Sequence, residues 1–172
     1  MARVHSAQLE MGRLVQTHNL LRCAFATPGP VAHVVNENTV VRSAAAMEYH
    51  LGRRCRRRAS ARPKRHPTAQ DLLGDWDPQT DWPDVCMRTL FLLRHFIVHL
   101  RGRYSPRSLT PSSRRLLLPA YRRFRSVVQA ARVHEGHMLN LSAAEVIEPL
   151  LLGCRDYWKR NRRNRLGVAK TP

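Results

Sequence analysis

Four histidines stand at spacings that could bring several imidazoles onto one metal ion. His95 and His99 are four residues apart in an apolar segment, and His134 and His137 enclose two residues in HEGH. An i, i+4 pair on a helix can present two imidazoles to one ion, but this segment lacks the glutamate of the H-E-x-x-H motif. Histidines are also common on basic interaction surfaces. We therefore expect no metal and no cofactor.

Motifs for nucleophilic or nucleotide chemistry are missing from the sequence. The chain has no G-x-S-x-G, no P-loop and no G-x-G-x-x-G, and its eight glycines are scattered. Its cysteines are far apart and do not form the C-x-x-C pair of zinc sites, so we expect reduced, structural thiols. They are Cys23, Cys55, Cys86 and Cys154. The sequence predicts that the protein is not an enzyme.

The net charge carries the strongest functional signal. Thirty lysines and arginines face 12 acids, which gives a formal net charge of +18 and an isoelectric point of about 11.5. Self-repulsion at this charge opposes compaction, whereas a polyanionic partner converts the same charge into binding energy. Some subunits of assemblies without nucleic acid are also basic, but the composition favours a nucleic-acid partner.

Arginine supplies nearly all of this charge. Lysine occurs only at Lys64, Lys159 and Lys170, so the other 27 of the 30 cations are arginine. The planar guanidinium grips phosphate or carboxylate through two parallel hydrogen bonds and stacks on flat rings. A genome rich in G and C would produce the same bias, and both explanations stay open.

The basic residues gather in three blocks, at residues 53–65, 101–132 and 155–165. Tyrosines lie beside these arginines, where a ring could stack on a base or on a guanidinium. Arginines spread over a loop, a helix face and a tail suit an irregular RNA fold better than a DNA major groove. The candidate nucleic-acid-binding residues are Arg53, Arg54, Arg56, Arg57, Arg58, Arg62, Lys64, Arg65, Arg114, Arg115, Arg122, Arg125, Arg132, Lys159, Arg160, Arg162, Arg163 and Arg165.

An acidic stretch follows the first basic block. Residues 71–84, DLLGDWDPQTDWPD, contain five aspartates and no cation. Aspartate, proline and glycine at this density make turns, and Trp76 and Trp82 would be costly to leave exposed. We expect the two tryptophans to anchor the loop on the body or at an interface with a protein neighbour. Pairing of the acidic loop with the preceding basic run is the alternative.

The sequence predicts that the elements which carry these residues are mostly helices. Residues 85–101, VCMRTLFLLRHFIVHLR, are the most apolar segment and indicate a buried helix at the centre of the fold. Thr110 as N-cap and Pro111 at the first helical position predict where the next helix begins. Ser142 and Glu145 form the S-x-x-E pattern of a capping box ahead of a third helix.

The sequence therefore predicts a mostly α small helical bundle of about three main helices with long basic, partly irregular arms at both ends. We place these helices near residues 85–102, 111–133 and 142–161. The expected divisions are an N-terminal arm with short helices and a basic loop (1–66), an acidic tryptophan loop (67–84), the helical body (85–161) and a basic C-terminal tail (162–172).

The N-terminal arm gives weaker signals. Residues 6–26 could form a helix, residues 33–41 have the β-branched character of a short strand, and residues 43–52 read as a short helix. The arm is rich in arginine and poor in acids, as in an organellar transit segment or the basic arm of an assembly subunit. We expect an arm that is retained and a mitochondrial matrix location.

Residues 118–125, LPAYRRFR, resemble the opening of the LYR-motif proteins, which are small helical bundles of the mitochondrial matrix that act as respiratory-complex subunits or assembly factors. Ala120 stands where the motif has leucine, and Tyr121 and Arg122 match its last two positions. The resemblance implies that these two residues help to dock a protein partner, commonly together with an acyl carrier protein.

These patterns predict a non-catalytic structural subunit of a large organellar ribonucleoprotein, above all a mitochondrial ribosomal protein that binds rRNA and neighbouring protein subunits. The alternative is an accessory, LYR-like subunit of a mitochondrial respiratory or ATP-synthase complex whose basic face meets acidic proteins or anionic lipid heads. We expect no membrane span, because no run approaches about eighteen uncharged apolar residues, and no small-molecule substrate.

Overall fold

The computed structural model describes residues 12–13, 16, 30–58 and 68–167, and the side chains of residues 30–31, 54, 56–58 and 161–167 lie outside this description. Its described part is mostly α-helical and contains an isolated bridge between Arg103 and Met138 but no strand. The predicted fold class is confirmed. The helices are α2 (Pro30–Arg58), α3 (Ala69–Leu73), α4 (Trp82–Leu100), α5 (Pro111–Val127) and α6 (Ala144–Gly167), with short 3-10 turns at Pro106–Ser108 and Gln129–Ala131.

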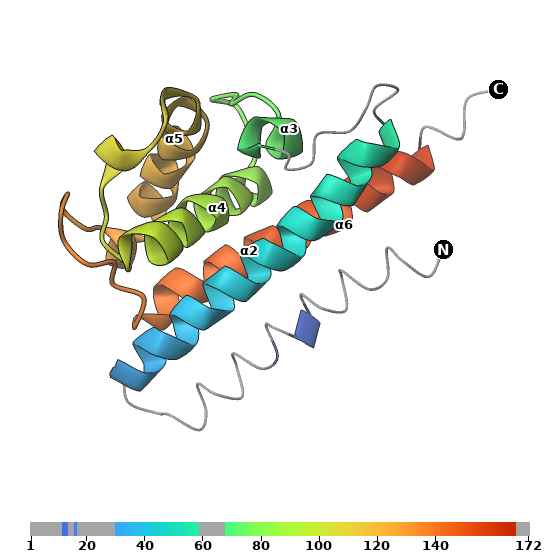
Figure 1. The fold of residues 1–172 in the computed structure, drawn as a ribbon. Coiled ribbons are helices and arrows are strands. Elements are labelled where there is room, and N and C mark those ends of the chain that lie inside the picture. Colours follow the sequence, from blue (N-terminus) through green and yellow to red (C-terminus); the bar gives the residue numbers. More distant parts are fainter. Residues whose placement is uncertain (1–11, 14–15, 17–29, 59–67, 168–172) are drawn as a thin grey trace.

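Helix α4 is the centre of the bundle. It contacts α2, α5 and α6, and Figure 1 shows α2 and α5 on either side of it. Every residue from Asp84 to Leu93 is buried, which few surface helices would tolerate. The Asp81 side chain caps the helix by accepting a hydrogen bond from the Asp84 N–H at 3.3 Å. The expectation of a buried central helix is confirmed.

Helix α2 differs from the secondary structure predicted for residues 33–52. Residues 33–41 are not a strand, and residues 43–52 are not a separate short helix, because both lie within one continuous helix. Its buried residues Val40, Ala44, Met47 and Leu51 recur at steps of four, three and four, the period of one helix face. Packing of this face overrides the weak strand preference of the β-branched residues. Residues 30–58 therefore belong to the bundle core.

Helix α5 begins as predicted, with the Thr110 hydroxyl accepting from the Ser113 N–H at 3.2 Å. It continues past Pro119 but ends at Val127, six residues before the predicted end at residue 133. The predicted helix extended too far because Val128 and Ala131 continue its apolar spacing in the sequence but are buried outside the helix, Ala131 in a 3-10 turn. Regular spacing of apolar residues indicates which residues are buried, but it does not show that they all belong to one α-helix.

Helix α6 begins at Ala144, and the predicted capping box is not what starts it. Ser142 lies two residues before the helix, and its hydroxyl donates to Oδ1 of Asn140 at 2.7 Å. A capping box forms instead ahead of α3, where the Thr68 hydroxyl accepts from the Asp71 N–H and the Asp71 carboxylate accepts from the Thr68 N–H at 2.8 Å. The acidic loop is thus partly helical.

Candidate nucleic-acid interface

Helices α2 and α6 run side by side in the same direction, although about a hundred residues separate them in sequence (Figure 1). Near the start of α2, the Asn36 carboxamide donates to the carbonyl of Leu141, just ahead of α6. Further along, the ring of His50 lies 5.9 Å from the ring of Trp158. Both helices then continue beyond this aromatic contact, so their C-terminal turns end on the same side of the molecule.

These two C-terminal segments carry the first and third basic blocks, and we call them the basic end. Each helix supplies five cations from the sequence, which are Arg53, Arg54, Arg56, Arg57 and Arg58 on α2 and Lys159, Arg160, Arg162, Arg163 and Arg165 on α6. Cations near a helix C-terminus are favoured by the helix dipole, which accounts for some of them. Ten cations on two adjacent helix ends also repel one another unless a polyanion neutralises them.

Contacts within the chain already engage part of this charge. Arg160 forms an ion pair with Asp81, and its guanidinium lies 5.7 Å from the centre of the Tyr157 ring. Lys159 lies 3.6 Å from Asp156. The acidic loop therefore neutralises a residue of α6. Both of these ion pairs are substantially exposed, so water screens them and a phosphate could replace the carboxylate.

The second basic block forms a separate surface on α5. Arg115 and Arg122 are exposed there. Other candidates donate to carbonyl oxygens of the same region: Arg114 to Leu109 at 3.3 Å, Arg125 to Val133 at 3.4 Å and Arg132 to Arg125 at 3.4 Å. Because α5 and α2 lie on either side of α4 (Figure 1), the structure does not join the three blocks into one patch.

The structure describes only part of the candidate nucleic-acid-binding set. Arg62, Lys64 and Arg65 lie outside the described residues. For Arg54, Arg56, Arg57, Arg58, Arg162, Arg163 and Arg165 the structure gives the helical backbone position but not the side chain.

Both tryptophans of the acidic loop pack against this chain's own body and remain partly exposed. Trp82 stacks on Phe124 of α5, with ring centres 5.5 Å apart and planes 8° from parallel. Trp76 lies beneath the guanidinium of Arg88, at 5.7 Å from the ring centre. The expectation that they anchor the loop on the body is confirmed, whereas contact with a protein neighbour stays a prediction.

Sequence reasoning did not identify Arg88 as the residue that holds the acidic loop. Its side chain is 2% exposed and donates to the Asp84 carboxylate and to backbone carbonyls of residues 73–75. The available signal was an aspartate and an arginine four residues apart within an apolar helix, a spacing that allows an ion pair. Arginine at such a position is retained only when its donors are satisfied.

The histidines form two pairs. The rings of His95 and His99 are 5.0 Å apart, and those of His134 and His137 are 5.9 Å apart. Burial, together with His99 and Arg94 nearby, lowers the pKa of His95. Within the described residues, no group of three or more histidines, cysteines or acids could hold a metal ion.

The tyrosine of the LYR-like segment is buried in the hydrophobic core of this protein. Tyr121 is 1% exposed, and its hydroxyl donates to the carbonyl of Ala131 at 2.7 Å. Burial raises the pKa of this phenol above its ordinary range. A ring in this position is not presented to a partner, so of the two matched residues only the exposed Arg122 is accessible for docking.

Comparisons with models of protein families, with curated proteins and with solved structures found no match to this chain. Within the described residues, no helix combines the length and the apolar character needed to cross a bilayer.

Proposed function

We propose that this protein is a non-catalytic structural subunit of a large organellar ribonucleoprotein, above all a mitochondrial ribosomal protein of the matrix that binds rRNA. The observation that carries the proposal is the basic end, where two basic helix ends from distant parts of the sequence lie together. A single charge run is often only a solvated surface. Convergence of two such runs concentrates positive charge where a phosphate backbone could contact both helices.

The mechanism is scaffolding. Arginines at the basic end neutralise phosphates and release condensed counterions, which favours binding without reading base sequence. The exposed arginines of α5 provide a second surface on the other side of α4, where they could contact another RNA segment. A subunit with cations on separate faces can hold two RNA segments at a set distance, which is the work of a structural protein in a ribonucleoprotein.

A protein neighbour with acidic loops is the competing partner, as in the alternative of an accessory subunit of a respiratory or ATP-synthase complex. The Asp81–Arg160 pair supports this alternative, because it is an example of an acidic protein segment that binds a residue of the basic end. The LYR-like docking role has less support, because Tyr121 is buried.

Charge-neutral variants of the full chain test the proposal. Arg162, Arg163 and Arg165 changed together to glutamine remove three cations from α6. Arg114, Arg115 and Arg122 changed to glutamine remove three exposed cations from α5, the other surface. We expect the α6 variant to lose more affinity for a short RNA and to flatten the slope of log affinity against log salt. Each lost phosphate contact lowers that slope by roughly 0.7 for single strands and roughly 0.9 for duplexes.

Equal losses in the two variants would mean that net charge alone matters and would contradict a specific basic end. Recovery from mitochondria provides the second measurement. We expect crosslinking to recover rRNA with the tagged chain, and nuclease treatment to release it. Nuclease-resistant recovery with inner-membrane proteins alone would support the accessory-subunit alternative and refute the ribosomal proposal.

A further inference from the structure

Tyr49 is a half-exposed aromatic residue on α2, just before the first arginine of the basic end. Its side chain is 55% exposed, one helical turn before Arg53 on α2. The Arg53 guanidinium carbon lies 5.6 Å from the ring centre, and Nη1 donates to the Tyr49 hydroxyl at 3.0 Å. The His50 ring also meets the Tyr49 ring edge-on, with ring centres 5.2 Å apart. These two neighbours restrict the orientation of an aromatic ring that is otherwise open to solvent.

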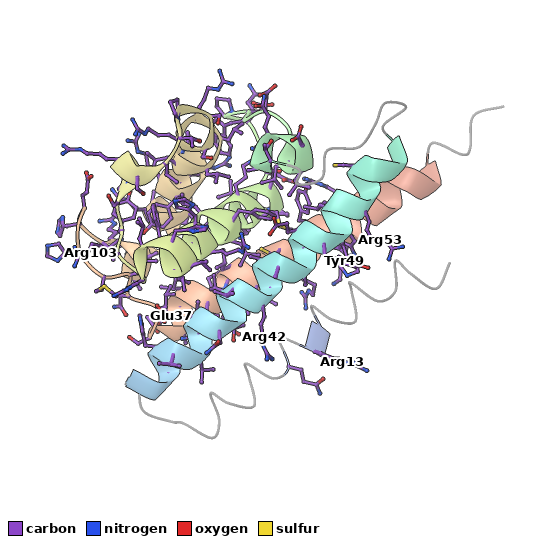
Figure 2. All side chains as sticks on the ribbon, in the orientation of Figure 1. Arg13, Glu37, Arg42, Tyr49, Arg53 and Arg103 are labelled. Atoms are coloured by element: carbon purple, nitrogen blue, oxygen red, sulfur yellow. The ribbon has the colours of Figure 1, made fainter. Side chains whose placement is uncertain are left out.

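The side of α2 that carries Tyr49 is free of acids. Its exposed residues Asn38, Arg42, Ala45 and Tyr49 recur at steps of four, three and four, and we call them the α2 outer face. Figure 2 shows the side chains of Arg42, Tyr49 and Arg53 along the same side of the helix. From Arg42 to Arg53 this line is roughly 16 Å long at the rise of an α-helix.

The two acids of α2 are engaged elsewhere. Glu37 lies 3.3 Å from His33 on the same helix, and Glu48 forms an ion pair of 3.4 Å with Arg94 of α4. Neither carboxylate belongs to the α2 outer face, so among the residues that the structure describes an approaching anion meets only cations, small side chains and the tyrosine ring there.

The equivalent pair on α6 is built differently. Tyr157 also lies beneath an arginine, at 5.7 Å from Arg160, but its ring is only 7% exposed and Arg160 is paired with Asp81. Tyr104 and Tyr121 are buried as well. Tyr49 is thus the tyrosine of the described residues that a ligand can reach without rearrangement of the core.

We propose that Tyr49 and Arg53 form a stacking site for one unpaired base of a single-stranded RNA whose backbone continues onto the basic end. The inference rests on the proposed function and names the form of RNA bound there. An exposed ring beside a cationic groove is the arrangement by which proteins bind single strands, because every base presents a π-face. In a duplex the bases are stacked on each other, so a duplex would use only the arginines.

Affinity measurements on the full chain separate stacking from charge. The probes are an unstructured single-stranded RNA and a duplex of equal length, each bound to the wild type and to the Tyr49→Leu and Tyr49→Phe variants. Leucine keeps apolar bulk without a π-face, and phenylalanine keeps the ring without the hydroxyl. Val127→Ala is the matched control, because Val127 is an exposed apolar residue at the end of α5.

Loss of one stacked base lowers affinity by roughly 5- to 150-fold. We expect a loss in this range for Tyr49→Leu with the single strand and no change with the duplex. Tyr49→Phe and Val127→Ala should bind both RNAs like the wild type. The salt slope of Tyr49→Leu should equal that of the wild type, because no phosphate contact is removed.

Two results would overturn the stacking site while leaving the proposed function standing. One is a Tyr49→Leu variant that binds the single strand as tightly as the wild type. The other is an equal loss for single strand and duplex, which would point to a general change in the helix. If the wild-type chain binds neither RNA, the proposed function itself fails, and the stacking site fails with it.

Discussion

Arg88 donates through Nε to Oδ2 of Asp84 at 2.6 Å, one helical turn earlier on α4, and both residues are buried. The remaining guanidinium nitrogens donate to the carbonyls of Leu73 at 2.8 Å, Gly74 at 3.1 Å and Asp75 at 2.9 Å. One side chain therefore joins the central helix to the last residue of α3 and the two residues that follow it. Since the charge is both paired and hydrogen-bonded, its burial is tolerated.

Replacing Arg88 with methionine should destabilise the protein strongly. The substitution leaves the Asp84 carboxylate and three carbonyls without their donor, and breaking a buried pair in this way costs about 3–5 kcal/mol. Urea denaturation followed by far-UV circular dichroism measures the free energy of unfolding. Arg94→Met is the matched control, because its pair with Glu48 is about one-third exposed and should contribute at most about 1 kcal/mol. Equal losses in the two variants would contradict the role assigned to Arg88.

Gly153→Ala should also destabilise the fold. In a helix, alanine is normally better than glycine by about 0.5–1 kcal/mol. Here an added methyl group would overlap the Cys86 thiol, and it would lie 2.6 Å from the Cys86 Cβ, because α4 and α6 cross closely at this point. We expect a net loss of about 1–3 kcal/mol in urea denaturation. A more stable variant would show that the helices can separate at no cost.

The Cys86→Gly/Gly153→Ala double variant checks the same contact. It removes the side chain that the new methyl group would meet, so the two substitutions should not add. Glycine within α4 has its own cost of about 1 kcal/mol. The double variant should nevertheless be more stable than the sum of the single changes predicts, and strict additivity would argue against the clash.

The cysteines of the described residues should differ sharply in reactivity. Burial, with a smaller contribution from Asp156, raises the pKa of Cys86 to about 12, and burial also raises the pKa of Cys154. Because the thiolate is the reactive form, both should resist iodoacetamide at pH 8, while the partly exposed Cys55 should react. Peptide mass spectrometry resolves the three sites. Unfolding in urea should make all three reactive, and rapid labelling of Cys154 without urea would contradict its burial.

His95 should make the folded state less stable in mild acid. Burial next to His99 and Arg94 lowers its pKa below 6.5, so the unfolded chain binds this proton at a higher pH than the folded protein does. Stability from this source is complete above pH 6.5 and falls as the pH drops toward the folded-state pKa. His95→Gln should therefore lose less stability than the wild type between pH 7.5 and 5.5 in urea denaturation.

His134→Gln is the control for that experiment, because His134 is exposed in a loop. It should keep the wild-type difference between the two pH values. If His95→Gln keeps that difference as well, the destabilisation in acid comes from other groups.

Local patterns predicted the start of α5 and the central position of α4. Thr110 and Pro111 act on the backbone beside them, and α4 is the most apolar segment of the chain, so both predictions follow from neighbouring residues. The strand expected at residues 33–41 was wrong for the opposite reason. β-branched residues have only a weak conformational preference, and α2, which contains the buried Val40, packs on α4, which begins more than forty residues after Val40.

The candidate site shows the same division. The arginine blocks are evident from the sequence, and the polyanionic partner inferred from them stays a prediction. The sequence does not reveal that Tyr49 is exposed, because Tyr104, Tyr121 and Tyr157 also stand near arginines and are buried. Only the structure shows that Arg88 donates to backbone carbonyls of the acidic loop and that Arg160 is paired with Asp81.

The sequence by itself determined the helical class, the beginning of α5 and the excess of positive charge, since these follow from neighbouring residues and from simple counts. Only the tertiary structure decided that α2 and α6 end on the same side and that α5 carries its arginines elsewhere (Figure 1). It also decided which tyrosine remains open to solvent. These outcomes depend on which apolar faces pack together, because α2 and α6 both pack on α4, which lies between them in the sequence.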